Sequence, residues 1–208
     1  ISEIMYHPVL SNIDDNRHEY IELHNAKDAE VDIGEWKLIA NGQPGLEFRF
    51  PAGAKIPAKG FVVVAKDKVE LLKLTKYGLE ASKVFGPYTG ELSNGGATIA
   101  LRDKSDTLID NALYNDKAPW PLAADAFGAG RGWFEEPAWF RSTDPRAEPD
   151  LAKYRVALGY MGSSLERVSY VAMATDIANW SPSPVEKGPS PGKANDTLVY
   201  ASDNEVEN

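Results

Sequence analysis

Between residues 19 and 64 the chain reads Glu19-Tyr-Ile-Glu-Leu-His-Asn25, Val31-Asp-Ile-Gly-Glu-Trp-Lys-Leu38, Phe48-Arg-Phe-Pro51 and Gly60-Phe-Val-Val-Val64. Each run is short and rich in β-branched or aromatic residues, and Gly, Pro and Asn separate one run from the next. This punctuation is typical of strands joined by tight turns. It predicts an all-β protein, an antiparallel β-sandwich, which is a scaffold and supplies no chemistry of its own.

The same pattern continues beyond residue 64, with one interruption. Residues 98–102 and 108–114 predict a hairpin. Residues 67–78 depart from the strand pattern. Asp67, with Glu70 three positions later, resembles a capping box, and Gly78 is a typical helix stop. We therefore expect one short helical insertion between two strands.

The composition excludes several classes of protein. The 208 residues carry a formal net charge of -9, and a negative field repels phosphate backbones, so we expect no nucleic-acid partner. The chain has no Cys, which excludes disulfides, thiolate nucleophiles and thiolate zinc sites. No apolar run is long enough to span a bilayer. We also expect no cofactor, because no phosphate-binding loop or metal cage is apparent.

One all-β domain is enough to account for the length of the chain. We expect this domain to span residues 1–200 and to be followed by a flexible acidic tail at 201–208. The chain begins at Ile1 without Met, already inside a strand-like run. We interpret it as one part of a longer, multidomain chain.

The run from His18 to His24 superficially suggests a zinc-protease helix. Such a helix needs His at positions i and i+4, and position i+4 here is Glu22. Read as a strand, the run places its alternate polar residues on one face and directs Ile21 and Leu23 toward the core. We interpret the polar face as solvated, or as the site of a His–Glu contact.

No other pattern predicts catalysis or metal binding. All three His lie within residues 7–24, and no Gly-x-Ser-x-Gly elbow is present. The acidic stretches Asp14-Asp-Asn16 and Asp103-Lys-Ser-Asp106 lack EF-hand spacing and are interpreted as solvated turns. We therefore predict no catalytic residue, no metal site and no enzyme activity. We interpret three Trp as core or loop anchors, because Trp is largely buried on average: Trp36, Trp120 and Trp180.

A set of short motifs runs in order along nearly the whole chain. They are Ile1-Ser-Glu-Ile-Met-Tyr6, Glu19-Tyr-Ile-Glu-Leu23, Gly34-Glu-Trp36, Phe50-Pro-Ala-Gly53, Gly60-Phe-Val-Val-Val64, Leu92-Ser-Asn-Gly-Gly96, Ala118-Pro-Trp-Pro121, Ser164-Leu-Glu-Arg167, Asn179-Trp180 and Ser190-Pro-Gly192. Each motif alone is weak, but their order and spacing make the set specific. Together they resemble the lamin tail domain family, especially its bacterial members.

The resemblance implies an immunoglobulin-like sandwich without catalytic residues, found in bacteria in exported or cell-surface proteins. We therefore hypothesise a non-catalytic binding or structural module of a larger exported protein, which associates with a protein, a polysaccharide or the cell surface. An alternative is an accessory domain that targets a secreted hydrolase or nuclease to its substrate. A third interpretation is self-association through a sheet edge.

Residues 128–163 resemble an insertion into the family pattern and are rich in aromatic residues and Arg. These residue types are enriched at binding hot spots. The rings also suit a satellite core that packs the loop onto the sandwich. If they form a contact surface, we predict that it contains Trp133, Trp139, Phe140, Arg131 and Arg141.

Overall fold

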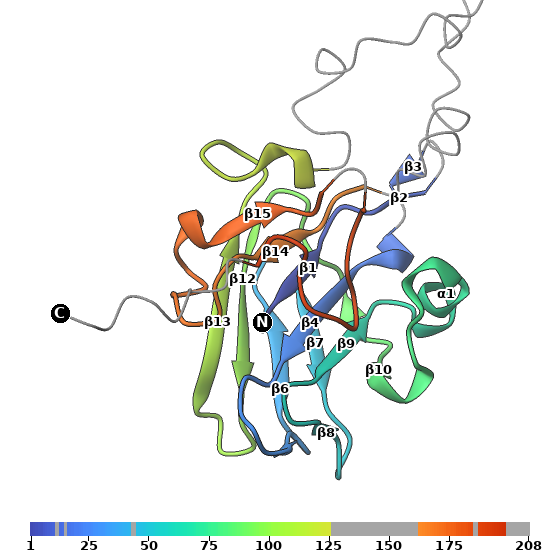
Figure 1. The fold of residues 1–208 in the computed structure, drawn as a ribbon, viewed down its shortest axis with the longest axis vertical. Helices are drawn as coiled ribbons and strands as arrows, with labels where there is room; N and C mark the ends of the chain where they lie inside the picture. Colours follow the sequence, from blue (N-terminus) through green and yellow to red (C-terminus); the bar gives the residue numbers. More distant parts are fainter. Residues whose placement is uncertain (11–12, 15, 43–44, 126–161, 185–186, 199–208) are drawn as a thin grey trace, which may run out of the picture.

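The computed structural model describes residues 1–10, 13–14, 16–42, 45–125, 162–184 and 187–198 (Figure 1). Two sheets dominate it. The six-stranded sheet has the spatial order β10 (Val84–Phe85), β9 (Phe61–Ala65), β4 (Tyr20–His24), β1 (Glu3–Met5), β14 (Leu165–Arg167) and β15 (Trp180–Pro182). The five-stranded sheet has the order β11 (Thr89–Gly90), β7 (Leu46–Arg49), β6 (Lys37–Ala40), β12 (Ala97–Arg102) and β13 (Leu108–Tyr114).

Two small ribbons and several short helical turns complete the described chain. The ribbons pair β2 (Val9–Leu10) with β3 (Ile13–Asp14), and β5 (Val31–Asp32) with β8 (Lys55–Ile56). The 3-10 turns are η1 (Asn16–His18), η2 (Thr75–Tyr77), η3 (Ala81–Lys83), η4 (Leu122–Ala124) and η7 (Ile177–Asn179). Among the described residues, no helix has both the length and the apolar character needed to cross a membrane.

The main core lies between the two sheets. Ile4, Ile21 and Leu165 reach it from the six-stranded sheet, and Leu38 and Ile99 reach it from the five-stranded sheet; all five are fully buried. Strand register places Ile4 opposite both Ile21 and Leu165. Because strand side chains alternate between faces, this register aligns one apolar row per sheet. The predicted all-β sandwich, with Ile21 on its core face, is confirmed.

One pair of strands departs from the expected antiparallel pattern. β10 runs parallel to β9, with Val84 opposite Val63. A parallel pair needs a crossover connection, and residues 66–83 supply it. The predicted helix forms within this crossover as α1 (Lys68–Lys73). The Asp67 side chain caps it by accepting hydrogen bonds from the backbone N–H groups of Val69 and Glu70.

The crossover also covers part of the outer face of the six-stranded sheet. Leu71 of α1 and Tyr77 of η2 pack there against Tyr20, Val63 and Met5 in a second buried cluster. Gly78 ends η2 with a backbone φ of 63°. This value lies in the left-handed region, which Gly adopts without steric cost. The helix therefore covers the sheet at these strands, so this part of the sheet is buried on both faces.

Candidate functional site

The most unusual feature of the fold is a row of three buried glutamates on the outer face of the six-stranded sheet. Strand register places Glu3 of β1 opposite Glu22 of β4 on one side and opposite Glu166 of β14 on the other. All three residues are fully buried. The interpretation of the Glu22 face as solvated is therefore wrong, because alternation identifies a second face but does not say what covers it.

Residues 188–198, which we call the closing segment, cover this row. The closing segment crosses β1 and β4 in Figure 1. Three of its backbone N–H groups donate to the three carboxyls. Ser190 donates to Glu3 at 3.0 Å, Gly192 to Glu22 at 2.6 Å, and Thr197 to Glu166 at 3.1 Å. The row thus satisfies backbone donors that would otherwise be buried without partners.

Side chains strengthen the same contact. The Ser190 and Thr197 hydroxyls donate to Glu166 at 3.0 and 2.9 Å. Asn195 donates in the opposite direction, from its amide to the backbone carbonyls of Ser2 and Arg167 at 2.8 and 2.9 Å. The closing segment is therefore held through both its backbone and its polar side chains.

The two oxygens of Glu3 have very different surroundings. Oε1 accepts hydrogen bonds from the Tyr20 hydroxyl (2.6 Å), the Ser164 hydroxyl (2.5 Å) and the Ser190 backbone N–H. Oε2 is buried and has no hydrogen-bond partner. Oε1 is therefore saturated with donors, whereas Oε2 is a buried polar atom without a partner in either protonation state of Glu3.

Burial and like charge favour the neutral form of the three carboxyls, against the effect of the hydrogen bonds that they accept. Burial, and then the neighbouring charge of Glu166, raise the pKa of Glu3 to about 7. Burial, followed by the charge of Glu3, raises the pKa of Glu22 well above its usual value. Burial also raises the pKa of Glu166. Each shift disfavours the ionised form, because desolvation and like charge both penalise an anion.

This arrangement is structural and leaves none of the three row carboxyls positioned for catalysis. A general acid or base must reach a substrate, yet all three side chains are buried beneath the closing segment. No cluster of three or more His, Asp or Glu among the described residues is arranged to hold a metal ion.

His24, on the same strand as Glu22, belongs to a different cluster. Its ring stacks on Phe61 at 4.4 Å and lies 4.3 Å from the ring of Tyr170, measured between centroids. Burial lowers the pKa of His24 to about 4. A neutral imidazole packed between two rings behaves as an aromatic side chain.

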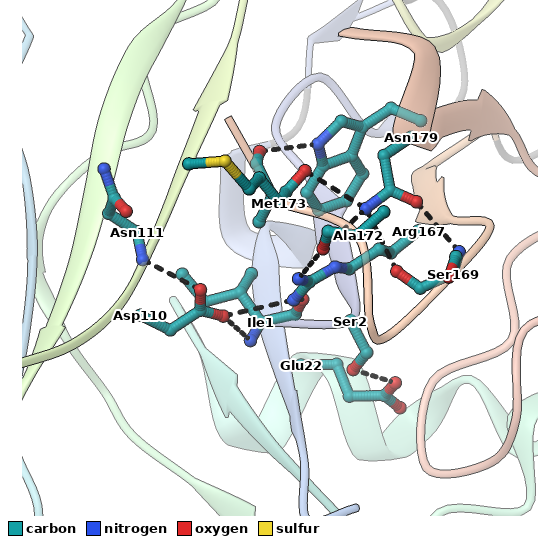
Figure 2. A network of polar contacts seen from close by, with 12 residues as sticks. Ile1, Ser2, Glu22, Asp110, Asn111, Arg167, Ser169, Ala172, Met173 and Asn179 are labelled. Carbon is teal, nitrogen blue, oxygen red and sulfur yellow. Dashed lines mark hydrogen bonds and ion pairs between the residues drawn. The ribbon is translucent and has the colours of Figure 1, made fainter. Parts of the chain in front are cut away.

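A second polar network joins the two sheets (Figure 2). Arg167 at the end of β14 donates to the carbonyl of Ile1 at 3.2 Å, to Asp110 of β13 at 3.3 Å and to the carbonyl of Ala172 at 2.5 Å. Asp110 also accepts from the Ile1 nitrogen at 2.7 Å. One guanidinium therefore ties together both sheets and the loop between β14 and β15, residues 168–179.

The same network includes one backbone N–H of the edge strand of the five-stranded sheet. β13 is its last strand, and the Asn111 backbone N–H donates to the Asp110 carboxylate at 3.0 Å. A register shift near Leu101 and Arg102 adds an irregularity at the start of β13. Bulges and edge charges are common devices against edge-to-edge pairing. They count against self-association through this edge.

Beside this network, five large apolar side chains are exposed. Two belong to the 168–179 loop and three to β13, and Arg167 contacts both segments. The five residues, which we call the apolar patch, are Val171 (94% exposed), Met173 (73%), Leu108 (48%), Ile109 (47%) and Leu113 (37%). In Figure 2 the Met173 side chain extends toward the strand that carries Asn111.

The structure tests some of the residues singled out by sequence. Trp120 and Trp180 are 5% and 4% exposed, and Trp36 packs against the same core, so their role as anchors is confirmed. The Trp180 indole N–H donates to the carbonyl of Ala174 at 2.8 Å. The Asp103 carboxylate caps its own turn by accepting from the backbone N–H groups of residues 105 and 107.

The predicted contact surface lies outside the described residues. This applies to Trp133, Trp139, Phe140, Arg131 and Arg141. The predicted acidic tail, residues 201–208, also lies outside them. The binding role of these residues stays a prediction.

A family model for the Lamin Tail Domain matches residues 1–116, which is more than half of the chain. The chain belongs to the lamin tail domain family. The match confirms the resemblance found in the motifs and agrees with an immunoglobulin-like sandwich. No curated protein matches the chain. The lamin tail domain match includes every described strand from β1 to β13 and ends before β14, β15 and the closing segment.

Sequence reasoning missed two members of the glutamate row in this lamin tail domain. The available signal was a Glu next to a core-facing aliphatic residue in three separate strands: Glu3 with Ile4, Glu22 with Ile21, and Glu166 with Leu165. Recognising a row requires the pairing of β1 with both β4 and β14.

Proposed function

We propose that this lamin tail domain is a non-catalytic association module of a larger exported bacterial protein, and that it binds a protein partner through the apolar patch. Membership of the family supports a non-enzymatic immunoglobulin-like domain. The internal hydrogen bonding of the buried glutamates supports it as well, because these groups stabilise the fold instead of facing a substrate.

The exposure of the patch is the observation that carries the proposal. Val171 and Met173 are 94% and 73% exposed. Single exposed apolar residues are ordinary, but several on two segments that one Arg joins mark a contact site. The loop that bears them is pinned, because the Asn179 amide donates to the carbonyls of Ser169, Ala172 and Met173. A pinned apolar loop loses little conformational entropy on binding.

A protein partner suits this patch better than a polysaccharide. Sugar faces stack on flat rings, and the patch consists of aliphatic side chains and one Met. Met is flexible and polarisable, and such side chains adapt to varied protein surfaces. Protein interfaces are correspondingly enriched in Met.

Site-specific photo-crosslinking in the full-length protein tests the proposal. A photoreactive residue at Val171 or Ile109 should give one discrete protein adduct in the producing cells. The matched control is Val69 on α1, which is 65% exposed and lies in another part of the fold. The same adduct should be absent at Val69. Equal labelling at all three positions, or none at the patch, would contradict the proposal.

The location of the protein is tested separately. The proposal places the domain outside the cytoplasm, on the cell surface or in the medium. Protease added to intact cells should therefore digest the domain. Protection of the domain in intact cells, together with digestion after lysis, would contradict export and leave the patch experiment interpretable.

A further inference from the structure

We propose that the closing segment is a proton-linked latch, docked on the six-stranded sheet while the glutamate row holds its protons and released as the row ionises. Its physical basis is the placement of three carboxyls in adjacent strand positions. Register partners on neighbouring antiparallel strands lie about 5 Å apart between Cα atoms. Three anions at this spacing, without water, would repel one another strongly.

The contacts of Glu3 explain why docking and protonation belong together. Ser190 N–H reaches the one Glu3 oxygen that also holds Tyr20 and Ser164, and the other oxygen has no partner. Ionisation of Glu3 would place negative charge on this unpartnered oxygen beneath the closing segment. Undocking lets water reach that oxygen, which removes the cost of burying the charge.

The charged groups around the row offset its raised proton affinity only in part, and the Ile1 nitrogen acts to lower the raised pKa of Glu22. Glu3 faces the hydroxyls of Tyr20 on β4 and Tyr77 on η2, which are uncharged at neutral pH. Glu22 interacts electrostatically with the Ile1 nitrogen and with Tyr170. On the closing-segment side, Glu166 faces Asp196, another acid, whose exposed partner Lys187 lies 2.7 Å from it.

The raised pKa of Glu3 sets the direction in which docking depends on pH. The docked form holds its proton up to about pH 7, whereas a hydrated carboxyl releases it near the ordinary value of 4.5. Docking is therefore strongest below pH 4.5 and weakens as the pH rises through 7. Glu3 therefore weakens docking as the pH rises from about 5.5 to about 8.5. Glu22 and Glu166 act in the same direction.

Hydrogen exchange of individual backbone amides, read by NMR on the full chain, tests the latch. After correction for the intrinsic pH dependence of exchange, protection of the Ser190, Gly192 and Thr197 amides should fall by at least about 10-fold over this pH range. The core amide of Ile99 reports the change in global stability over the same range, against which the protection of the latch amides is compared. If protection of the three latch amides in the wild-type protein does not change with pH, this result alone overturns the proposal.

Two Glu-to-Gln variants make the test specific. In Glu3→Gln the amide oxygen replaces Oε1 as acceptor and the NH2 group replaces the unpartnered Oε2, so the variant imitates the protonated acid. We expect protection at Ser190 to lose the part of its pH dependence that Glu3 supplies. The matched control is Glu19→Gln, a buried carboxyl outside the row that accepts from the Tyr88 hydroxyl and the Leu92 N–H. An unchanged pH profile in Glu3→Gln, or its loss in Glu19→Gln, would overturn the assignment.

Discussion

Replacement of Arg167 by Met should destabilise the domain by about 3 kcal/mol. Arg167 is 9% exposed and donates to three acceptors from different parts of the fold: the Ile1 carbonyl, the Asp110 carboxylate and the Ala172 carbonyl. Removal of one member of a buried ion pair costs about 3 to 5 kcal/mol, because the remaining charge stays desolvated. The Asp110 side chain is 26% exposed, so the lower end of this range applies.

Urea unfolding at neutral pH measures this loss in the free energy of unfolding, and thermal unfolding measures the corresponding change in melting temperature. For a domain of this size, 3 kcal/mol corresponds to a decrease of roughly 6 to 12 °C in the melting temperature. Arg102→Met is the matched control, because Arg102 forms a looser pair with Asp106 at 3.8 Å with both side chains more than a third exposed. Exposed pairs contribute about 0 to 1 kcal/mol. Equal losses in the two variants would refute the inter-sheet role of Arg167.

Two further predictions concern the other buried groups. Burial raises the pKa of Glu19 from 4.5 to about 8, so its contribution to stability is present at acid pH and is lost as the pH rises through 8. Between about pH 5.5 and about pH 8.5 this loss from Glu19 is about 3 kcal/mol. In urea titrations at the two pH values, Glu19→Gln should reduce the pH dependence of stability by this amount and leave the part that comes from the glutamate row. A wild-type slope retained in the variant would exclude Glu19 as a source. Leu71→Ala should cost about 2 to 5 kcal/mol, since Leu71 of α1 is fully buried against the sheet. Val69→Ala on the exposed side of the helix should stay within about 0.5 kcal/mol, and a similar loss in both variants would mean that the helix does not cover the sheet.

Much of the fold follows from local patterns. Alternation around Ile21 and Leu23 predicted the core face of β4, and both residues are buried between the sheets. Asp67 predicted the start of α1, and its side chain does cap the helix. These predictions succeeded because strand alternation and helix capping depend on residues within a few positions of one another.

The candidate site depended on contacts between distant segments. Tyr20 and Glu22 occupy the polar positions of β4, and alternation alone suggested that they face water. Both are fully buried, Tyr20 beneath the crossover segment and Glu22 beneath the closing segment. The alternation along a strand identifies its two faces. It contains no information on which segment, more than a hundred residues away, covers a face.

The residue pattern of this lamin tail domain specifies its strands, the helix and the apolar rows that bring the sheets together, because each of these depends on short-range periodicity. Pairing of β1 with both β4 and β14 then places Glu22, Glu3 and Glu166 side by side. The unusual pKa values of these carboxyls arise only after assembly, since burial and neighbouring charge require all three strands and the closing segment to be in position.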